Sequence, residues 1–437
     1  MTAAEMPQAE TPAGAPARPF PAGKPDFRSL DFSRTPFIVI WEVTQACDLA
    51  CLHCRAQARP WRDPCELTTE EGFRLLDDVR KFGPVLFVLT GGDPLYRPDI
   101  YEIIRYGTDI GLRMTMTPSG TKLVRKEMIR RMKDEGLARL AVSLDGHDRE
   151  SHDGFRGVPG SFAWTMNCIR WAREVGLELQ VNTTVTRYNR DHIREIGEML
   201  RDEGIALWSV FFLVPVGRGL KHDMVSPAEH EELFHLLYDM SREMPYDIKT
   251  TAAQHFRRVV LQRAAFERIA RGGGAHNGDI RPGEPGGDSR PGFLPPGRSR
   301  GFDAGIGRAA KGVNDGNGFV FISHVGEVFP SGFLPRSGGN VRERSVVEVY
   351  RESELFKTIR RVSALKGKCG YCDFADVCAG SRARAYGVTG DYLASEPYCT
   401  YNPPKPGSGR PVRNSYAGPH AESGVLSRVQ VTAALGQ

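Results

Sequence analysis

Three cysteines near the N-terminus are spaced so that they can converge on one metal centre. Cys47, Cys51 and Cys54 occur in the segment CDLACLHC (47–54), directly after the apolar run FIVIWEVT (37–44). Crowded thiolates repel one another unless a cation neutralises them, so a purely structural loop of thiols is the weakest explanation. Zinc is the rival metal, although zinc sites usually have four protein ligands and C-x2-C pairs. Three thiolates also fit a four-iron cluster whose fourth iron is left open.

A second group of cysteines lies near the C-terminus and comprises Cys369, Cys372, Cys378 and Cys399. Four cysteines clustered in this way indicate a metal site. On spacing alone, a zinc ion held by four thiolates is a fair alternative to an iron–sulfur cluster.

The two remaining cysteines need no metal. Cys168 lies between Trp164 and Trp171 on a helical face, where a cysteine usually serves as a small core residue. Cys65 follows Trp61 in a loop, and no role is assigned to it. Nine cysteines is an odd number, and the N-terminus lacks a basic segment followed by an apolar one. We therefore expect reduced thiols in a cytoplasmic protein.

The elements that position the first cysteines repeat one unit. Apolar, β-branched runs alternate with segments of helical periodicity, and Thr68 with Glu71 forms a capping-box signature before one of these helices. The six expected strands are 37–44, 85–90, 112–116, 137–144, 177–185 and 207–214. Four expected helices end in a glycine that leads into the next strand, at Gly111, Gly136, Gly176 and Gly204. Six βα units predict an α/β fold with parallel strands, a partial (β/α)6 TIM-like barrel.

Composition divides the chain further. Of its 437 residues, 40% are hydrophobic and 25% charged, which is enough for a real core. Pro- and Gly-rich stretches punctuate the ordered blocks, so disordered tails and a flexible insertion are expected there. The expected parts are a disordered tail 1–34, a barrel core 35–235, bridging elements 236–271, a flexible insertion 272–311, a small cysteine-rich domain 312–402 and a tail 403–437.

The charge pattern argues against two classes of partner. The formal net charge is only +5, and basic residues are mixed with acidic ones rather than gathered in a stripe, so nucleic acid is not expected as a partner. No apolar run approaches the length of a membrane span, so no membrane partner is expected either.

The C-x3-C-x2-C loop after the first strand of such a barrel resembles the signature of radical S-adenosylmethionine (SAM) enzymes. The resemblance covers about residues 35–215. In that family a Gly-Gly-Glu type motif after the second strand binds the SAM amino group. The matching segment here is Gly91, Gly92, Asp93 and Pro94, with Asp in place of Glu. The resemblance thus implies a SAM-binding [4Fe-4S] cluster held by the first three cysteines.

Further strand ends match the family's SAM contacts. Ser143 and Asp145 end the fourth strand and Asn182 lies on the fifth, at positions that resemble ribose and carboxylate contacts. A strand-end cap or turn is a nearly equal alternative for each. Ser119 after the third strand is a weaker match. His53 stands where the family places a side chain beside the adenine, and a solvated loop histidine is an equal alternative.

Residues 367–399 resemble the C-terminal SPASM or Twitch-type extension of radical SAM enzymes, which holds auxiliary iron–sulfur clusters. Full SPASM domains have seven cysteines, and the first usually follows a Gly-containing hairpin. Here Ser331 stands at that position in GEVFPSG (326–332). The resemblance therefore implies one auxiliary [4Fe-4S] cluster, held by Cys369, Cys372, Cys378 and Cys399.

The resemblance implies an oxidoreductase that reductively cleaves SAM to a 5′-deoxyadenosyl radical, which abstracts hydrogen from a substrate. An electron donor such as flavodoxin or ferredoxin is expected. The C-terminal pattern resembles enzymes of haem and haem d1 synthesis, so the expected substrate is a tetrapyrrole. The alternative is a peptide maturase, although residues 1–34 do not resemble a leader-binding module. An iron–sulfur or zinc redox sensor is the non-enzymatic alternative.

One segment bears on the substrate. Residues 250–258 (TTAAQHFRR) bring a histidine and two arginines together, which is a suitable set for propionates. A basic, solvated helix start is the simpler expectation for this segment.

Overall fold

The computed structural model describes residues 30–270 and 312–405. Most of the expected tail 1–34, all of the insertion 272–311 and most of the tail 403–437 lie outside the described residues. No helix in the described part has both the length and the apolar character needed to cross a bilayer.

One curved sheet runs through the described chain, in the order β7-β6-β5-β4-β3-β2-β1-β8-β9. Strands β1 to β8 pair in parallel, and β9 is antiparallel to β8. The strands are β1 (Ile38–Thr44), β2 (Leu86–Gly91), β3 (Arg113–Met116), β4 (Arg139–Ser143), β5 (Leu179–Val185), β6 (Leu207–Phe212), β7 (Asp247–Thr251), β8 (Phe319–Ile322) and β9 (Val328–Phe329). All six expected strands are present, and the predicted partial α/β barrel is confirmed.

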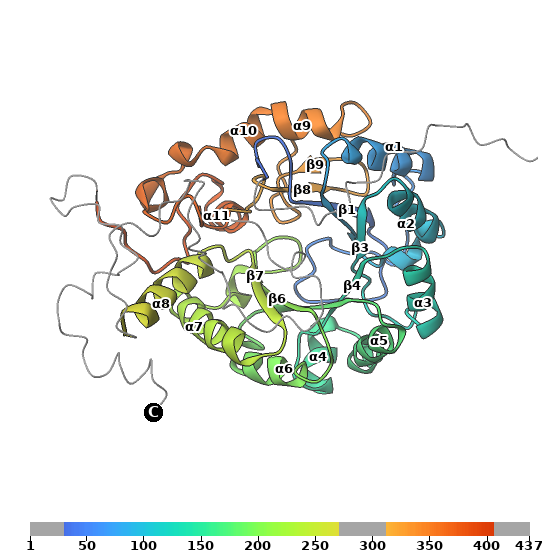
Figure 1. Ribbon diagram of the computed structural model, residues 1–437, viewed down its shortest axis with the longest axis horizontal. Helices are drawn as coiled ribbons and strands as arrows, with labels where there is room; N and C mark the ends of the chain where they lie inside the picture. The colour runs from blue at the N-terminus through green and yellow to red at the C-terminus, as the bar shows by residue number, and fades with distance from the viewer. Residues whose placement is uncertain (1–29, 271–311, 406–437) are drawn as a thin grey trace, which may run out of the picture.

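Helices cover the convex side of the sheet (Figure 1). They follow the strands around the barrel from α1 to α8, and α9 and α10 complete the arc next to α1. Their bounds are α1 (Thr69–Arg80), α2 (Ile100–Asp109), α3 (Lys126–Asp134), α4 (Arg149–Arg156), α5 (Ser161–Val175), α6 (Ile193–Met199), α7 (Pro227–Glu243), α8 (Phe256–Ala270), α9 (Val346–Glu352), α10 (Glu354–Arg360) and α11 (Arg382–Thr389).

Local sequence signals explain the helix ends. Thr68 and Glu71 form the predicted capping box at the start of α1. The four helix-terminal glycines all have positive φ, between 70° and 94°, which is the left-handed region that only glycine adopts without strain. They are Gly111, Gly136, Gly176 and Gly204.

The C-terminal part of the chain joins the barrel sheet. β8 lies beside β1, with Ile38 paired to Phe319 and Trp41 to Ile322. This strand covers an edge of β1 that six strands alone would leave open, and an open edge carries unsatisfied backbone groups. The run Phe319–Ile322 is short and apolar, and its partner strand is distant in sequence, so periodicity alone did not reveal the pairing.

Alternate residues of each strand face the helices or the lumen of the barrel. Trp41 and Trp208 face the helices and are fully buried. On the opposite face, one register row runs across four strands through Ser143, Asn182, Ser209 and Lys249. Polar side chains therefore line the lumen of the barrel, whereas the helix-facing side of the sheet is mainly apolar.

Candidate metal centres and cofactor site

The first three cysteines lie in a loop at the carboxyl end of β1. Their thiols form a small cluster with Leu49, and Val158 packs against it. The loop is fixed by backbone hydrogen bonds to the segment after β4 and to the segment after β6. The Leu52 amide donates to the Phe155 carbonyl at 3.1 Å, and the Arg218 amide donates to the Cys54 carbonyl at 2.9 Å. The structure thus brings Cys47, Cys51 and Cys54 together at the mouth of the barrel.

The protein alone does not favour thiolates in this loop. Burial raises the pKa of Cys47 to about 11 and also raises the pKa of Cys51. The Leu49 amide donates to the Cys47 sulfur at 3.4 Å, and Ser119 Oγ lies 3.2 Å from the same sulfur. A bound metal deprotonates coordinating thiols outright. The three sulfurs therefore fit a cationic metal group, because its positive charge would stabilise the thiolate form that burial disfavours.

The second strand end approaches this loop closely. A Cβ on Gly92 would lie 2.2 Å from the Ala46 carbonyl oxygen, and one on Gly91 would lie 2.2 Å from the Thr44 carbonyl oxygen. Gly91 also has a φ of 153°. Only glycines allow the backbones of β1 and β2 to come this near, so both predicted glycines have a structural requirement at the site.

The Asp93 carboxylate is engaged with the protein. It caps the short 3-10 helix Pro94–Tyr96 by accepting from the Leu95 amide at 3.2 Å, and it accepts from Thr121 Oγ1 at 3.0 Å. Burial raises the pKa of Asp93 to about 6. The segment is held in one conformation, and Asp93 stabilises it through its side chain.

The predicted contacts on β4 and β5 lie on neighbouring strands. Ser143 and Asn182 are register partners, so their side chains share one face. Asp145 is buried and accepts from Arg156 Nη1 at 3.0 Å and from the Thr184 amide at 2.7 Å. Arg156 also donates to the Ser119 carbonyl at 3.2 Å. The arginine thereby joins the ends of β3 and β4 beneath the cysteine loop.

His53 is half-buried within the cysteine loop. Its ring stacks on Phe155 with centroids 4.5 Å apart and 16° between the planes. Burial lowers the pKa of His53 to about 4, and its Nδ1 is buried with no hydrogen-bond partner in the described chain. The neutral ring therefore lies flat against Phe155, within the cysteine loop itself.

The four C-terminal cysteines line one cavity. This cavity is partly open to solvent, and its wall includes all four cysteines. No three His, Cys, Asp or Glu side chains of residues 30–270 and 312–405 converge tightly enough to bind a single metal ion. His255, Arg258, Lys368 and Glu396 also line this cavity.

Backbone amides are directed at these sulfurs. Cys369 accepts from the Glu396 amide at 3.3 Å, Cys372 from the Phe374 amide at 3.4 Å and Cys378 from the Gly380 amide at 3.4 Å. Burial raises the pKa of Cys372 to about 12 and raises that of Cys378 further. Amide donors stabilise sulfur that carries negative charge, so this set also fits a cationic iron–sulfur group.

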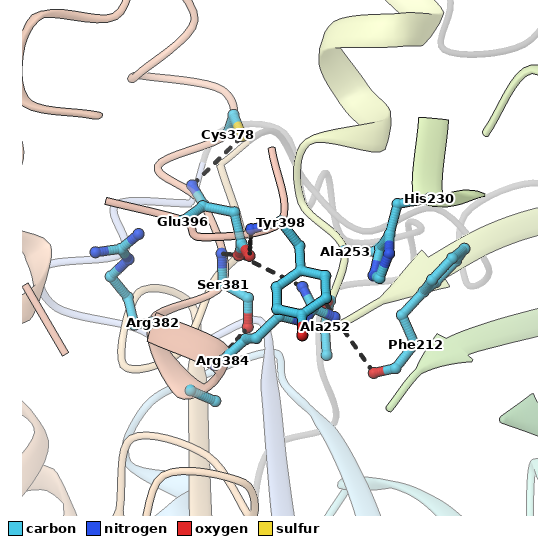
Figure 2. A network of polar contacts seen from close by, with 12 residues as sticks. Phe212, His230, Ala252, Ala253, Cys378, Ser381, Arg382, Arg384, Glu396 and Tyr398 are labelled. Carbon is cyan, nitrogen blue, oxygen red and sulfur yellow. Dashed lines mark hydrogen bonds and ion pairs between the residues drawn. The ribbon is translucent and has the colours of Figure 1, made fainter. Parts of the chain in front are cut away.

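A buried ion pair connects the cysteine segment to the barrel (Figure 2). Arg384 on α11 lies 3.4 Å from Glu396, and both side chains are fully buried. Arg384 also donates to the carbonyl of Phe212 at the end of β6 and to that of Ala252 after β7. Glu396 in turn accepts from the Ser381 amide at 2.8 Å. The cavity is therefore fixed relative to the strand ends.

Two segments that the sequence analysis singled out lie near this cavity: Ser331 and residues 250–258. Ser331 is buried, and its hydroxyl hydrogen-bonds with the buried Asp315 and accepts from the Phe333 amide at 3.3 Å. The expectation of a solvated helix start at 250–258 was wrong. His255 and Arg258 are buried on the cavity wall, and Arg257 donates to the Val377 carbonyl at 2.9 Å. The segment packs on a partner more than a hundred residues away, which local composition does not reveal.

Sequence reasoning missed several residues of both sites. The Arg156 carbonyl and the Arg218 side chain hold the first loop by hydrogen bonds to its backbone, and Arg384 and Glu396 hold the cavity. The repeated arginines of SRARA (381–385) were the only signal for any of these four.

Cys168 and Cys65 stand apart from both sites. Cys168 is fully buried in the main hydrophobic core, as the helical pattern predicted. Cys65 is exposed.

Comparisons with known proteins agree with this arrangement. Residues 41–200 match the family model of the radical SAM superfamily. The chain is 40% identical over 376 residues to the AdoMet-dependent heme synthase of Methanosarcina barkeri, covering 86% of this chain and 99% of that protein. It is 26% identical over 375 residues to the PqqA peptide cyclase of Rhodopseudomonas palustris, covering 84% and 87% of the two chains.

The fold is also found among solved structures. Streptococcus suis SuiB bound to S-adenosylmethionine superposes with a TM-score of 0.60 at 16% identity, covering 84% of this chain and 78% of that one. Membership of the family implies a [4Fe-4S] cluster and SAM. The chain belongs to the radical SAM superfamily and is a radical SAM enzyme.

Proposed function

We propose that this enzyme abstracts hydrogen from a carboxylated side chain of a tetrapyrrole. The observation that carries the proposal is the 40% identity to an AdoMet-dependent heme synthase over 99% of that protein's length. The identity to the peptide cyclase is lower, at 26%. A tetrapyrrole is therefore preferred to a peptide as the substrate.

The first-cluster ligands in this proposal are Cys47, Cys51 and Cys54, whose thiols are gathered at the barrel mouth. When bound, the cluster and SAM supply a 5′-deoxyadenosyl radical. Gly91 and Gly92 let the second strand end pack directly against the backbone of this loop, and the contact to the SAM amino group is assigned to this segment beside the cluster.

The remaining SAM contacts are assigned to residues of the strand ends. Asp93 and Pro94 hold the short helix that follows the glycines. Because the Asp93 carboxylate is already hydrogen-bonded to the protein, the SAM contact of this segment is assigned to its backbone. Ser143 and Asn182 present side chains on the lumen face. Asp145 positions the neighbouring strand end through Arg156 and the Thr184 amide. His53, neutral and stacked on Phe155, offers a flat surface for the adenine.

The lumen supplies a counter-charge for a carboxylated substrate. Lys249 shares its register row with Ser143 and Asn182, and no ion pair to Lys249 is formed within the described ranges. Burial, together with the charge of Arg139 on β4, lowers the pKa of Lys249 to about 8. An amine without a counter-ion in this position is stabilised when an anion enters. Lys249 is therefore assigned to bind a substrate carboxylate.

The auxiliary group in this proposal is one [4Fe-4S] cluster in the cavity lined by Cys369, Cys372, Cys378 and Cys399. The amides directed at the sulfurs support this assignment. Its place beside the ends of β6 and β7 is suited to electron transfer with a substrate in the lumen, since Arg384 bridges the two. A small redox protein of the flavodoxin or ferredoxin type is proposed as the external electron donor.

Incubation of the anaerobically reconstituted protein with SAM, reductant and propionate-bearing tetrapyrroles tests the proposal. We expect a SAM-dependent mass change of one tetrapyrrole. An unchanged mass for every tetrapyrrole, together with modification of a short peptide, would assign the protein to the peptide maturases instead. A chain that binds zinc and no iron would exclude both activities.

A further inference from the structure

His255 is a buried imidazole on the wall of the cavity that the four C-terminal cysteines line. Its exposed fraction is 1%. Neither Nδ1 nor Nε2 has a hydrogen-bond partner in the part of the chain that the structure describes. The same cavity wall contains Cys369, Cys372, Cys378 and Cys399. The space between the cysteines therefore adjoins this ring and can supply the polar contact that it lacks.

The ring is held rigidly by its neighbours. Phe234 meets it edge-on, with centroids 4.7 Å apart and 80° between the planes. His230 stacks on its other side at 5.8 Å. The His255 carbonyl accepts from the Arg258 amide at 3.1 Å, which fixes the backbone at the start of α8. The imidazole cannot swing out to solvent without breaking this packing.

The lack of a partner has an energetic consequence. A buried polar group without a hydrogen bond costs about 1–3 kcal/mol, so proteins seldom leave one unsatisfied. Burial and the nearby charges of Arg384, Arg258 and Lys368 keep the pKa of His255 well below its usual value. In either protonation state an imidazole retains at least one N–H donor. That donor requires an acceptor inside the cavity.

We propose that His255 donates its N–H to a sulfur of the group held by the four cysteines, and that this hydrogen bond raises the reduction potential of that group. The inference rests on the proposed auxiliary cluster. Hydrogen bonds to cluster sulfur are one of the means by which a protein sets the potential. Because the four thiols already provide one ligand for each iron of a four-iron cluster, His255 is a positioning residue and not a ligand.

The test uses the full chain with both clusters reconstituted. The auxiliary signal is the electron paramagnetic resonance signal that survives the substitution Cys51→Ala. We expect His255→Leu to lower the midpoint potential of that signal and to leave the iron content unchanged. His152→Leu is the matched control, because His152 is equally buried and carries an unpartnered Nε2 but neither lines the cavity nor stacks on His255. Its midpoint should equal that of the unsubstituted chain.

A second measurement does not depend on the folding of a variant. In chains labelled with ¹⁵N-histidine, pulsed resonance of the auxiliary signal should show one weakly coupled nitrogen, as expected for an N–H···S contact. A strong ¹⁵N coupling would show that a histidine is a cluster ligand, and the absence of any ¹⁵N coupling would show that no histidine contacts the cluster. Either result overturns the inference. An unchanged potential in His255→Leu overturns it as well. Loss of every cluster signal in Cys51→Ala would instead show that the proposed auxiliary cluster itself is wrong.

Discussion

The nine cysteines differ in what surrounds each sulfur, and these surroundings decide their roles. Cys47, Cys51 and Cys54 gather at a strand end, and four more line a cavity with amides directed at three of them. Cys168 lies in the apolar core and Cys65 is exposed. The cysteines proposed as ligands are therefore those whose thiols have polar groups and other thiols as neighbours.

Removal of one first-loop thiol should abolish SAM cleavage. In Cys51→Ala only two of three ligands remain, so the first cluster is expected to be lost along with the 5′-deoxyadenosine that its reduction yields. Chromatographic quantification of 5′-deoxyadenosine under anaerobic, reducing conditions measures the effect. Cys65→Ser is the matched control and should retain full cleavage. Undiminished 5′-deoxyadenosine from Cys51→Ala would refute the ligand assignment.

Lys249 should make substrate binding depend on pH. The amine must be charged to bind a carboxylate, and its pKa is lowered to about 8 by burial and by Arg139. Affinity for a carboxylated tetrapyrrole is therefore expected to fall as the pH rises through 8, and Lys249→Met should weaken binding about tenfold, or ~1.4 kcal/mol. Absorbance titration without SAM measures this. Lys81→Met, on the outer surface, should bind normally, and pH-independent binding by the unsubstituted chain would contradict the role.

The same lysine should make the stability of the substrate-free protein rise with pH, whereas it makes substrate affinity fall. Between about pH 8 and 10.5 the unfolded chain holds the Lys249 proton while the folded chain releases it, so this group makes the free energy of unfolding rise with pH in that window. Below pH 8 both states are protonated and the penalty of burying the charge is fully present. Lys249→Met should therefore stabilise the substrate-free protein at pH 7, measured as a higher urea midpoint. A lower midpoint at pH 7 would contradict this account.

At the scale of elements, two glycines decide how closely β2 approaches the first cysteine loop. A methyl group on Gly92 would meet the Ala46 carbonyl oxygen at 2.2 Å, so one strand end must move. Gly92→Ala is expected to reduce SAM cleavage at least about tenfold, equivalent to ~1.4 kcal/mol of transition-state stabilisation. Gly154→Ala in α4 meets nothing within 4 Å and should leave cleavage unchanged. Equal cleavage by both variants would show that the close approach is unimportant.

The buried Arg384–Glu396 pair fixes α11 and the cavity to the ends of β6 and β7. Arg384→Met leaves Glu396 buried without its partner, which should cost about 3–5 kcal/mol of stability. The exposed pair of Arg194 with Glu243 offers the comparison, because its loss in Arg194→Met should cost less than about 1 kcal/mol. Urea unfolding of both variants measures the difference. Similar midpoints for the two would mean that α11 is fixed by other contacts.

Much of the barrel was predictable because its signals are local. The six strand runs, the capping box of α1 and the glycines after four helices each depend on neighbours in sequence. The pairing of β8 with β1 and the packing of 250–258 on the cysteine segment depend on partners far away in the chain. The lumen position of Lys249 required the register of four strands. Long-range contacts of this kind leave no periodic trace in a single sequence.

At the scale of the whole molecule, the sheet unites the parts that the composition separates. β8 lies beside β1, whose carboxyl end leads into the first cysteine loop, while α11 connects the second cysteine group to β6 and β7. Both cysteine segments therefore adjoin strand ends of one barrel. This arrangement is what a reaction in the lumen requires if electrons are to pass between a substrate and two separate centres.

The transfer of hydrogen from the substrate tests the central claim most directly. The reconstituted enzyme is incubated with SAM, reductant and an iron tetrapyrrole whose propionate side chains are deuterated, and 5′-deoxyadenosine is analysed by mass spectrometry. The account predicts that deuterium appears in 5′-deoxyadenosine and that the tetrapyrrole changes mass in the same reaction. Formation of 5′-deoxyadenosine without deuterium, beside an unchanged tetrapyrrole, would contradict it.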